Sequence, residues 1–333
     1  MGNANGGGAP RRPRPLSLSL VLRRCAAALA TLVFVVLANF FLFRILPGNP
    51  EKTFAPRGRN ADPETLRQLR ETLGINDPLN VQFGKYLQQL AHLDLGWSWS
   101  KKEPVLDLIL RGLWPTVLLS GTALVLASGI GVWLGSRAGW RYGSRFDRWS
   151  SNLAVTFYST PEWLLGLVVL VVLGRFGLGA GGMTDPRSEL PVWLDVLRHM
   201  VVPVLVLAVV YVAEYSLIMR SSILDERRAD YLTTARAKGL RDDLVLRRHA
   251  MPNALLPTVS LLFLSLGFVV AGAITVEMVF SWPGLGRLTY EATRGPDVPL
   301  LQGLFLFFSA AVIFMNLLAD LLMPVLDPRV RQP

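Results

Sequence analysis

Cysteine and histidine are scarce in this chain, and their scarcity argues against metal chemistry. The 333 residues include one cysteine, Cys25, and three histidines. A single cysteine forms neither an internal disulfide nor a cysteine metal cluster. The histidines His92, His199 and His249 are far apart in the sequence and are expected in different compartments, so no metal site is predicted.

Nucleotide-binding and hydrolytic motifs are also missing. The chain has no Gly-x-x-x-x-Gly-Lys-Ser/Thr phosphate loop, so it is not expected to bind and split a nucleoside triphosphate itself. It has no Gly-x-Ser-x-Gly nucleophile elbow either. The sequence therefore predicts neither an enzyme nor a bound cofactor. No internal repeat was found, which argues against secondary transporters built from repeats that sequence can detect.

Charged residues are few, at 17% of the chain, against 51% hydrophobic residues and a mean hydropathy of +0.39. Several apolar runs are long enough to cross a hydrocarbon layer of roughly 30 Å, which takes about 20 helical residues. The sequence therefore predicts an all-α polytopic membrane protein with about six transmembrane helices. The expected spans cover residues 25–43, 113–136, 151–174, 196–219, 255–279 and 300–323.

The formal net charge of +10 fits cytoplasmic loops better than a nucleic-acid partner, because no basic face with interleaved aromatics is apparent. We expect both termini in the cytoplasm, together with an arginine-rich loop at 137–148 that binds anionic lipid.

Residues 1–20 combine Gly, Pro and Arg and are expected to form a disordered cytoplasmic arm. The first apolar run is too long for a signal peptide, so we interpret it as a retained helix.

Residues 44–112 are expected to form a small folded external segment. Asp62-Pro63 is typical of a helix start, and apolar residues between 79 and 90 repeat at helical spacing. Trp97 and Trp99 suit a membrane–water boundary. The loop 280–299, with the turn Trp282-Pro283-Gly284, is expected to be an external connection.

Ionisable residues in or near the spans are candidates for a translocation path. A charge inside the hydrocarbon layer is costly, so such a residue usually faces a cavity or a partner. Glu162, which follows Thr160 and a proline, and Glu214 are the path candidates. The alternative is that Glu162, Glu277 and Asp320 lie near the interface and form local hydrogen bonds.

One polar stretch, residues 229–257, lies between two apolar spans and differs from an ordinary basic loop. Asp230 is expected to N-cap a short helix that runs to Lys238, and Gly239 suits the left-handed residue that ends it. A second short helix is expected over 242–248, with acidic residues first and arginines last. Two prolines, at positions 252 and 257, are expected to close the unit. Lipid anchoring does not explain this helix–glycine–helix–proline arrangement.

The spacing of Ala235, Gly239 and Pro252 resembles the cytoplasmic loop motif of permease subunits in ATP-binding-cassette importers. The segments DY, TARAKGL and HAMPNA resemble the peptide/nickel branch, specifically the first of its two permeases; they occupy residues 230–231, 234–240 and 249–254. Other segments agree, namely LPGNP at 46–50, LGINDP at 73–78, DLG at 94–96, STPE at 159–162, EMVFSWPGLG at 277–286, NLLAD at 316–320 and DPR at 327–329. The resemblance covers about residue 20 to the C-terminus.

The resemblance implies a type I importer fold over residues 21–333 in a bacterial inner membrane, with a cytoplasmic coupling region at 220–254. It implies three kinds of partner besides the bilayer: a second permease, two ATPase subunits and an external substrate-binding lipoprotein, with no nucleic acid. Ala235, Ala237 and Gly239 would permit close approach to an ATPase, and the cations Arg236, Lys238 and Arg241 would pair with its acidic groups. The implied coupling residues are Asp230, Tyr231, Thr234, Ala235, Arg236, Ala237, Lys238, Gly239, His249, Pro252 and Asn253.

The cargo implied by the resemblance is a dipeptide or oligopeptide. A nickel chelate, glutathione or an oligosaccharide stays open, because the binding protein supplies much of the selectivity in such importers. The alternative class is a channel or an ion-coupled carrier, which would contain buried ionisable pairs inside its spans and would need no ATPase.

Overall fold

The computed structural model describes residues 18–44, 77–176, 181–271, 273–295 and 297–326, and within these ranges the chain is helical with no β-strand. Five helices are long and apolar enough to cross a membrane, and a bent pair makes up to six. This confirms the expected all-α polytopic fold. The five are α1 (Leu18–Arg44), α5 (Val105–Trp140), α8 (Val192–Glu226), the helix over Asp242–Val270 and α14 (Val298–Leu326).

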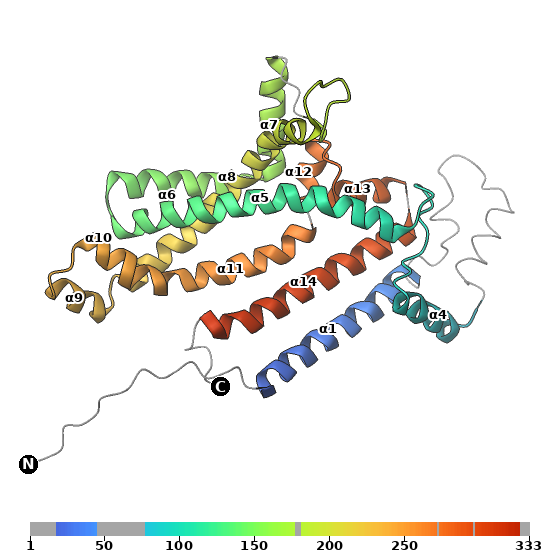
Figure 1. Ribbon diagram of the computed structural model, residues 1–333, viewed down its shortest axis with the longest axis horizontal. Helices are drawn as coiled ribbons and strands as arrows, with labels where there is room; N and C mark the ends of the chain where they lie inside the picture. Colours follow the sequence, from blue (N-terminus) through green and yellow to red (C-terminus); the bar gives the residue numbers. More distant parts are fainter. Residues whose placement is uncertain (1–17, 45–76, 177–180, 272, 296, 327–333) are drawn as a thin grey trace, which may run out of the picture.

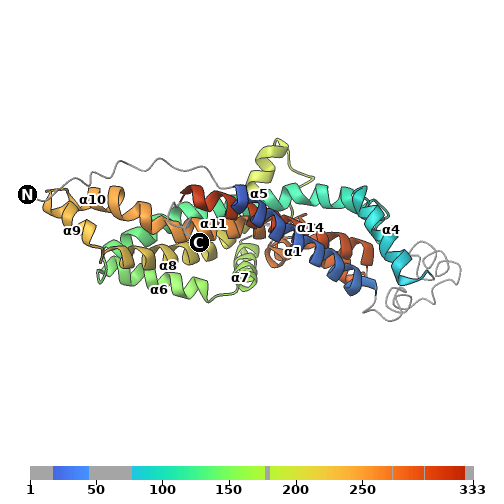
Figure 2. The same ribbon diagram turned by 90° about the horizontal axis from the view of Figure 1, so that it is seen from below.

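The long helices run roughly along the longest axis of the molecule (Figure 1). The short helices α9 (Asp230–Ala237) and α10 (Asp242–Val245) lie at one end, here called the α9 end, and α4 (Leu79–Ala91) lies at the other (Figures 1 and 2). Helix α4 confirms the helical spacing seen over 79–90. The helix expected to start at Asp62-Pro63 lies outside the described residues, as do residues 1–17 of the arm expected over 1–20. Residues 18–20 are not disordered, because α1 begins at Leu18.

The span expected over 151–174 is not one straight helix. Helices α6 (Arg145–Tyr158) and α7 (Glu162–Arg175) meet at a bend of 95°, and α7 runs across the direction of the other helices (Figure 1). The break falls at Thr160-Pro161, because a residue before proline is disfavoured in the α region and proline has no N–H to donate.

Helices α5 and α8 lie unusually close because glycines line their interface. A Cβ atom added at Gly135 would lie 2.3 Å from the carbonyl oxygen of Ser216, and one at Gly131 would lie 2.5 Å from the Cβ of Tyr215. Gly139 continues the stripe one turn further on, where a Cβ would lie 2.8 Å from the Arg220 carbonyl oxygen. Small residues at such spacing allow two membrane helices to pack backbone against backbone.

An ion pair joins α6 to α8 near the α9 end. The Arg220 Nε lies 2.6 Å from the Asp147 Oδ1, and the Gly143 N–H donates to the Asp147 Oδ2 at 2.9 Å. The Asp147 side chain is 3% exposed, so both its oxygens need these partners. Arg220 lies in the last turns of α8 and Asp147 in the first turn of α6, so the pair is not at the middle of a span and gives little support to the ion-coupled carrier.

The expectation that Pro252 and Pro257 close the polar unit is wrong. Helix α10 continues through a π-helical turn (Leu246–Ala250) into α11 (Met251–Ala271), and both prolines lie inside α11. In a regular α-helix the Pro252 ring would collide with the carbonyl of the residue four positions earlier. The π-helical turn directly before Pro252 relieves this conflict, so the helix continues unbroken.

The span expected over 255–279 is also too long, since α11 ends at Ala271 and a separate helix, α12 (Ile274–Val279), follows it. After α12 the chain makes the turn at Trp282. Trp282 is fully buried, and its Nε1 donates to the Pro115 carbonyl oxygen at 2.9 Å. The indole therefore fixes the turn against α5.

Glu277, on α12, holds three elements together from a fully buried position. Its Oε1 accepts a hydrogen bond from the Thr116 hydroxyl of α5 at 2.7 Å, and its Oε2 accepts one from the Arg287 N–H at 3.1 Å. Arg287 lies in the first turn of α13 (Leu285–Arg294), where a carboxylate is favoured by the helix dipole. The hydrogen bonding expected of Glu277 is thus confirmed, but its expected position near the membrane–water interface is not.

Replacing Glu277 with alanine is expected to lower the free energy of unfolding by about 3 kcal/mol, because the Thr116 hydroxyl and the amides of α13 lose their buried acceptor. Glu277→Gln, which keeps one oxygen, should cost less. Thermal unfolding in detergent measures both, with the exposed Glu189→Ala as the control. A melting temperature for Glu277→Ala equal to that of the control would contradict this role.

Candidate functional site

Helix α9 and the turn after it form the centre of the candidate site. Asp230 is the first residue of α9, and Ala229 precedes it as the N-cap without a side-chain hydrogen bond, so the N-cap predicted at Asp230 is wrong. Its carboxylate still lies in the first turn, where it suits the helix dipole.

The glycine predicted to end α9 is confirmed. Gly239 has a φ of +81°, in the left-handed region. Its N–H donates to the Arg236 carbonyl at 2.9 Å, and the Leu240 N–H reaches the Ala235 carbonyl at 3.4 Å. These two bonds form a Schellman motif, and Leu240 packs on the core below it.

One face of α9 is buried in the chain's own core. Leu232 is 0% exposed and Ala235 is 5% exposed. They pack in one cluster with Met219 and Ile223 of α8 and with Val245 of α10. Ala235 is therefore not available for close approach to another protein, whereas the opposite face of α9 is. That face carries the exposed residues Asp230, Thr234, Arg236, Ala237 and Lys238, with Gly239 beside them.

Aromatic and charged side chains link α9 to α10 and α5. The Asp242 Oδ2 accepts a hydrogen bond from the Trp140 Nε1 at 2.6 Å, and its Oδ1 accepts one from the Arg236 Nε at 3.2 Å. The Arg236 guanidinium lies 5.3 Å from the centre of the Trp140 ring. Arg236 is thus engaged within the chain, and Arg241 lies 3.4 Å from the Asp243 carboxylate. The contact of Trp140 with this site is not predicted from the sequence, because 102 residues separate Trp140 from Asp242.

A second set of contacts joins two motif segments that lie apart in the sequence, residues 230–231 and residues 249–254. The Asn253 Nδ2 donates to the Tyr231 hydroxyl oxygen at 2.9 Å, and that hydroxyl lies 3.4 Å from the His249 carbonyl oxygen. The Tyr231 hydroxyl also bonds to the Glu226 carboxylate at the end of α8. Pro252 lies beside them at the start of α11. The site therefore unites the start of α9, the end of α8 and the start of α11.

The three path candidates make separate contacts. Glu214, on α8, lines a cavity of about 260 Å³ with Tyr211 and Ser265, and no hydrogen bond or ion pair of its carboxylate is found in the described part of the chain. Glu162 instead accepts a hydrogen bond from the Thr275 hydroxyl at 2.9 Å. Thr160 lies at the α6–α7 bend, and its hydroxyl donates to the Thr156 carbonyl at 2.8 Å.

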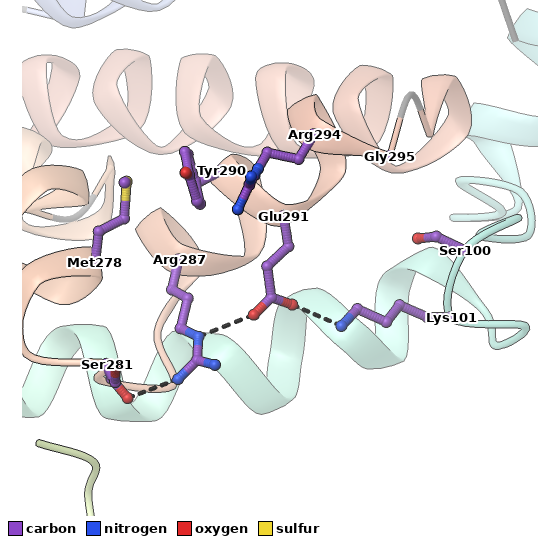
Figure 3. A pocket seen from close by; sticks show the side chains of 9 residues that line it. All are labelled: Ser100, Lys101, Met278, Ser281, Arg287, Tyr290, Glu291, Arg294 and Gly295. Atoms are coloured by element: carbon purple, nitrogen blue, oxygen red, sulfur yellow. Dashed lines mark hydrogen bonds and ion pairs between the residues drawn. The ribbon is translucent and has the colours of Figure 1, made fainter. Parts of the chain in front are cut away.

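A pocket of about 710 Å³ lies away from the α9 end, between α13 and the loop before α5 (Figure 3). The Glu291 carboxylate lies between the Lys101 Nζ at 2.6 Å and the Arg287 Nε at 2.9 Å. Arg294 has its guanidinium 5.6 Å from the Tyr290 ring centre. The pocket is lined by Ser100, Lys101, Met278, Ser281, Arg287, Tyr290, Glu291, Arg294 and Gly295.

The charges in this pocket leave an excess of cations, with Lys101, Arg287 and Arg294 against Glu291. Burial raises the pKa of Glu291, but hydrogen bonds from Lys101 and Arg287 and their positive charges outweigh it, and the pKa falls below its usual value. Glu291 is therefore ionised at neutral pH and balances one cation. The pocket is suited to receive a further carboxylate.

Two family models of binding-protein-dependent transport systems match the chain. The inner membrane component matches residues 127–332, and the N-terminal membrane component matches residues 17–120. The chain is 35% identical over 315 residues to the glutathione transport system permease protein GsiC of Pectobacterium atrosepticum, which covers 94% of this chain and 99% of that protein.

Two other relatives are similar over the same share of both chains. The dipeptide transport system permease protein DppB of Alkalihalophilus pseudofirmus is 32% identical over 334 residues, and a putative peptide permease protein of Brucella suis is 36% identical over 318 residues; each match covers 94% of this chain and 99% of the relative. The chain therefore belongs to the family of inner membrane components of binding-protein-dependent transport systems, as a multi-pass permease subunit of a bacterial ATP-binding-cassette importer that works with other transporter subunits.

Proposed function

We propose that residues 230–253, here called the coupling unit, receive the force of a separate ATPase subunit. The observation that carries this proposal is the two-sided character of α9. Its buried face fixes it to α8 and α11 through Leu232 and Ala235. Its exposed face presents Thr234, Ala237 and Lys238 at one end of the molecule.

The continuity of α10 with α11 supports a direct mechanical route into the membrane. An ATPase that moves α9 also moves α10, because Asp242 is bonded to both Arg236 and Trp140. From α10 the motion passes through the π-helical turn into α11 without a flexible joint. ATP-driven closure of the ATPases would thereby shift α11 and α8 as rigid elements and switch access to the path.

The proposed assembly has two related permeases, two ATPase subunits and an external binding protein, with the α9 end facing the cytoplasm. The proposed cargo is a short peptide, since two of the relatives named above are called dipeptide or peptide permeases. Glutathione, itself a short peptide, is the second candidate, because the relative from Pectobacterium is named for it.

Affinity purification of the tagged permease from its native membrane, followed by mass spectrometry, tests this composition. We expect a second permease, ATPase chains and a binding protein, whose bound ligand identifies the cargo. Recovery of a stable, monodisperse chain without an ATPase would contradict the proposed assembly. A binding protein that carries a nickel chelate or an oligosaccharide would refute the proposed peptide cargo but not the proposed assembly.

We propose Glu214 as a residue of the translocation path. Its half-buried carboxylate faces a cavity, and a charge inside a membrane span is costly unless it faces a cavity or a partner. Glu214→Gln is expected to lower uptake roughly tenfold through the loss of one charged contact of about 1.4 kcal/mol. Radiolabelled uptake measures it, with Glu189→Gln on an exposed loop as the control. Uptake by Glu214→Gln equal to that of the control would remove Glu214 from the path.

The pocket at α13 is proposed to accept an acidic side chain of the external binding protein. Arg294→Glu reverses the charge of the one lining cation that makes no ion pair in the described residues, and it should lower uptake roughly tenfold at low binding-protein concentration. Excess binding protein should restore uptake. Arg187→Glu, an exposed cation outside the pocket, is the control. A defect in Arg294→Glu that excess binding protein leaves unchanged would contradict this role.

A further inference from the structure

A second basic pocket, of about 660 Å³, lies at the α9 end between the last turns of α5 and the start of the α10–α11 helix. It is distinct from the exposed face of α9, because no residue of α9 lines it. Its lining combines cations with apolar and aromatic side chains. Arg137 and Arg141 come from the end of α5, and Arg247 comes from the π-helical turn.

The three arginines have no carboxylate partner in the part of the chain that the structure describes. Arg137 instead lies over the Trp133 ring, with its guanidinium carbon 4.7 Å from the ring centre. The two carboxylates that line the pocket are already paired. Asp242 is held by Arg236 and Trp140, and Asp243 lies 3.4 Å from the Arg241 Nε. The pocket therefore has an unbalanced positive charge.

The remaining lining shows which kind of anion suits this pocket. Val132, Leu246 and Met251 give it an apolar side along two membrane-spanning helices, and Trp133 and Trp140 both lie in the last turns of α5, with Trp140 as its final residue. Tryptophan is typical of the headgroup level of a bilayer. Arginines above an apolar wall at that level match a molecule with a phosphate at one end and a hydrocarbon chain at the other.

We infer that this pocket binds an anionic phospholipid, with its phosphate against Arg137, Arg141 and Arg247 and an acyl chain along Val132, Leu246 and Met251. The lipid would lie directly against Asp242 and so against the base of the coupling unit. It would brace α10 against α5 beside the Trp140–Asp242 hydrogen bond. The inference concerns binding and does not depend on the ATPase docking proposed above.

Native mass spectrometry of the full chain, purified with the subunits that accompany it, tests the inference with three probes: phosphatidylglycerol, phosphatidylcholine and glycerol 3-phosphate. We expect phosphatidylglycerol to be retained at least tenfold better than phosphatidylcholine. Glycerol 3-phosphate alone should not compete, since it lacks the acyl chain. Competition by glycerol 3-phosphate at equal concentration would show a free-phosphate site and overturn the lipid.

Two kinds of variant locate the binding. The triple variant Arg137→Gln/Arg141→Gln/Arg247→Gln should lose phosphatidylglycerol retention by roughly tenfold or more. The matched control replaces three exposed arginines of the same end that do not line the pocket, Arg145, Arg148 and Arg228, and should stay within about twofold. Equal losses in both triple variants would mean general surface attraction and would overturn the site.

A variant that fills the pocket keeps the test independent of the arginines. Gly129 lines the pocket, and a Cβ atom added there meets nothing within 4 Å. Gly129→Leu is therefore expected to fold and to occupy the space of the acyl chain, lowering phosphatidylglycerol retention with every arginine in place. Full retention by a folded Gly129→Leu would exclude the proposed position of the chain.

Discussion

Gly135→Ala is expected to remove most of the folded permease from the membrane. The added methyl group would lie 2.3 Å from the Ser216 carbonyl oxygen, 2.8 Å from the Met219 Cβ and 3.0 Å from the Arg220 backbone nitrogen. Two of these atoms belong to the α8 backbone, so no side-chain rotation relieves the collision. Helices α5 and α8 must separate, which we expect to cost about 3 kcal/mol or more, in a protein whose whole stability is about 5–15 kcal/mol.

Gly129→Ala is the matched control, since it makes the same change on the same helix where a Cβ atom meets nothing within 4 Å. Fluorescence-detected size-exclusion chromatography and thermal unfolding of both variants measure the difference. The control should behave as the wild type, while Gly135→Ala should aggregate or unfold at a much lower temperature. Wild-type stability of Gly135→Ala would show that α5 and α8 are not packed backbone to backbone.

Gly239→Asp is expected to abolish uptake while the permease still inserts and folds. Gly239 is exposed and nothing lies within 4 Å of a Cβ atom added there, so the chain's own packing is unaffected. Its φ of +81° makes an aspartate there mildly strained, at about 1 kcal/mol, which the helix cap tolerates. The loss arises instead from bulk and negative charge beside Ala237 and Lys238, on the face proposed to meet the ATPase.

Gly143→Asp supplies the control for backbone strain and charge at the same end. Gly143 has a φ of +80°, is exposed, and also has nothing within 4 Å of an added Cβ atom. It lies in the α5–α6 turn, outside the coupling unit. Transport assays and immunoblots of the membrane fraction compare the two. Normal uptake by Gly239→Asp, or an equal loss in Gly143→Asp, would contradict the assignment of the coupling unit.

Local sequence signals predicted the features that depend on local chemistry. Hydropathy predicted about six spans, and the structure has five, or up to six with the bent pair. The helical spacing over 79–90 predicted α4. Gly239 was predicted as a left-handed helix end because few other residues adopt that conformation, and the Schellman motif confirms it. Each of these features is decided by residues within a turn or two of one another.

Features that depend on distant contacts were predicted poorly. The sequence predicts that Pro252 ends the polar helical unit, but tertiary packing of Val245 and Ala250 holds α10 and α11 in line across the π-helical turn. Ala235 was assigned to the partner-facing surface, although α8 covers it. The burial of Trp282 is not evident from the sequence, because nothing near it in the chain shows that Pro115 accepts its N–H.

The chain's single cysteine allows a direct test of the central claim, that the coupling unit docks on an ATPase. After Cys25→Ser, a cysteine is introduced by Lys238→Cys on the exposed face of α9 or, as the control, by Arg187→Cys on the exposed loop before α8. Each variant is treated in native membranes with a short thiol-to-amine cross-linker. The account predicts an ATPase adduct from Lys238→Cys and none from Arg187→Cys. An ATPase that co-purifies yet forms no adduct with Lys238→Cys would contradict it.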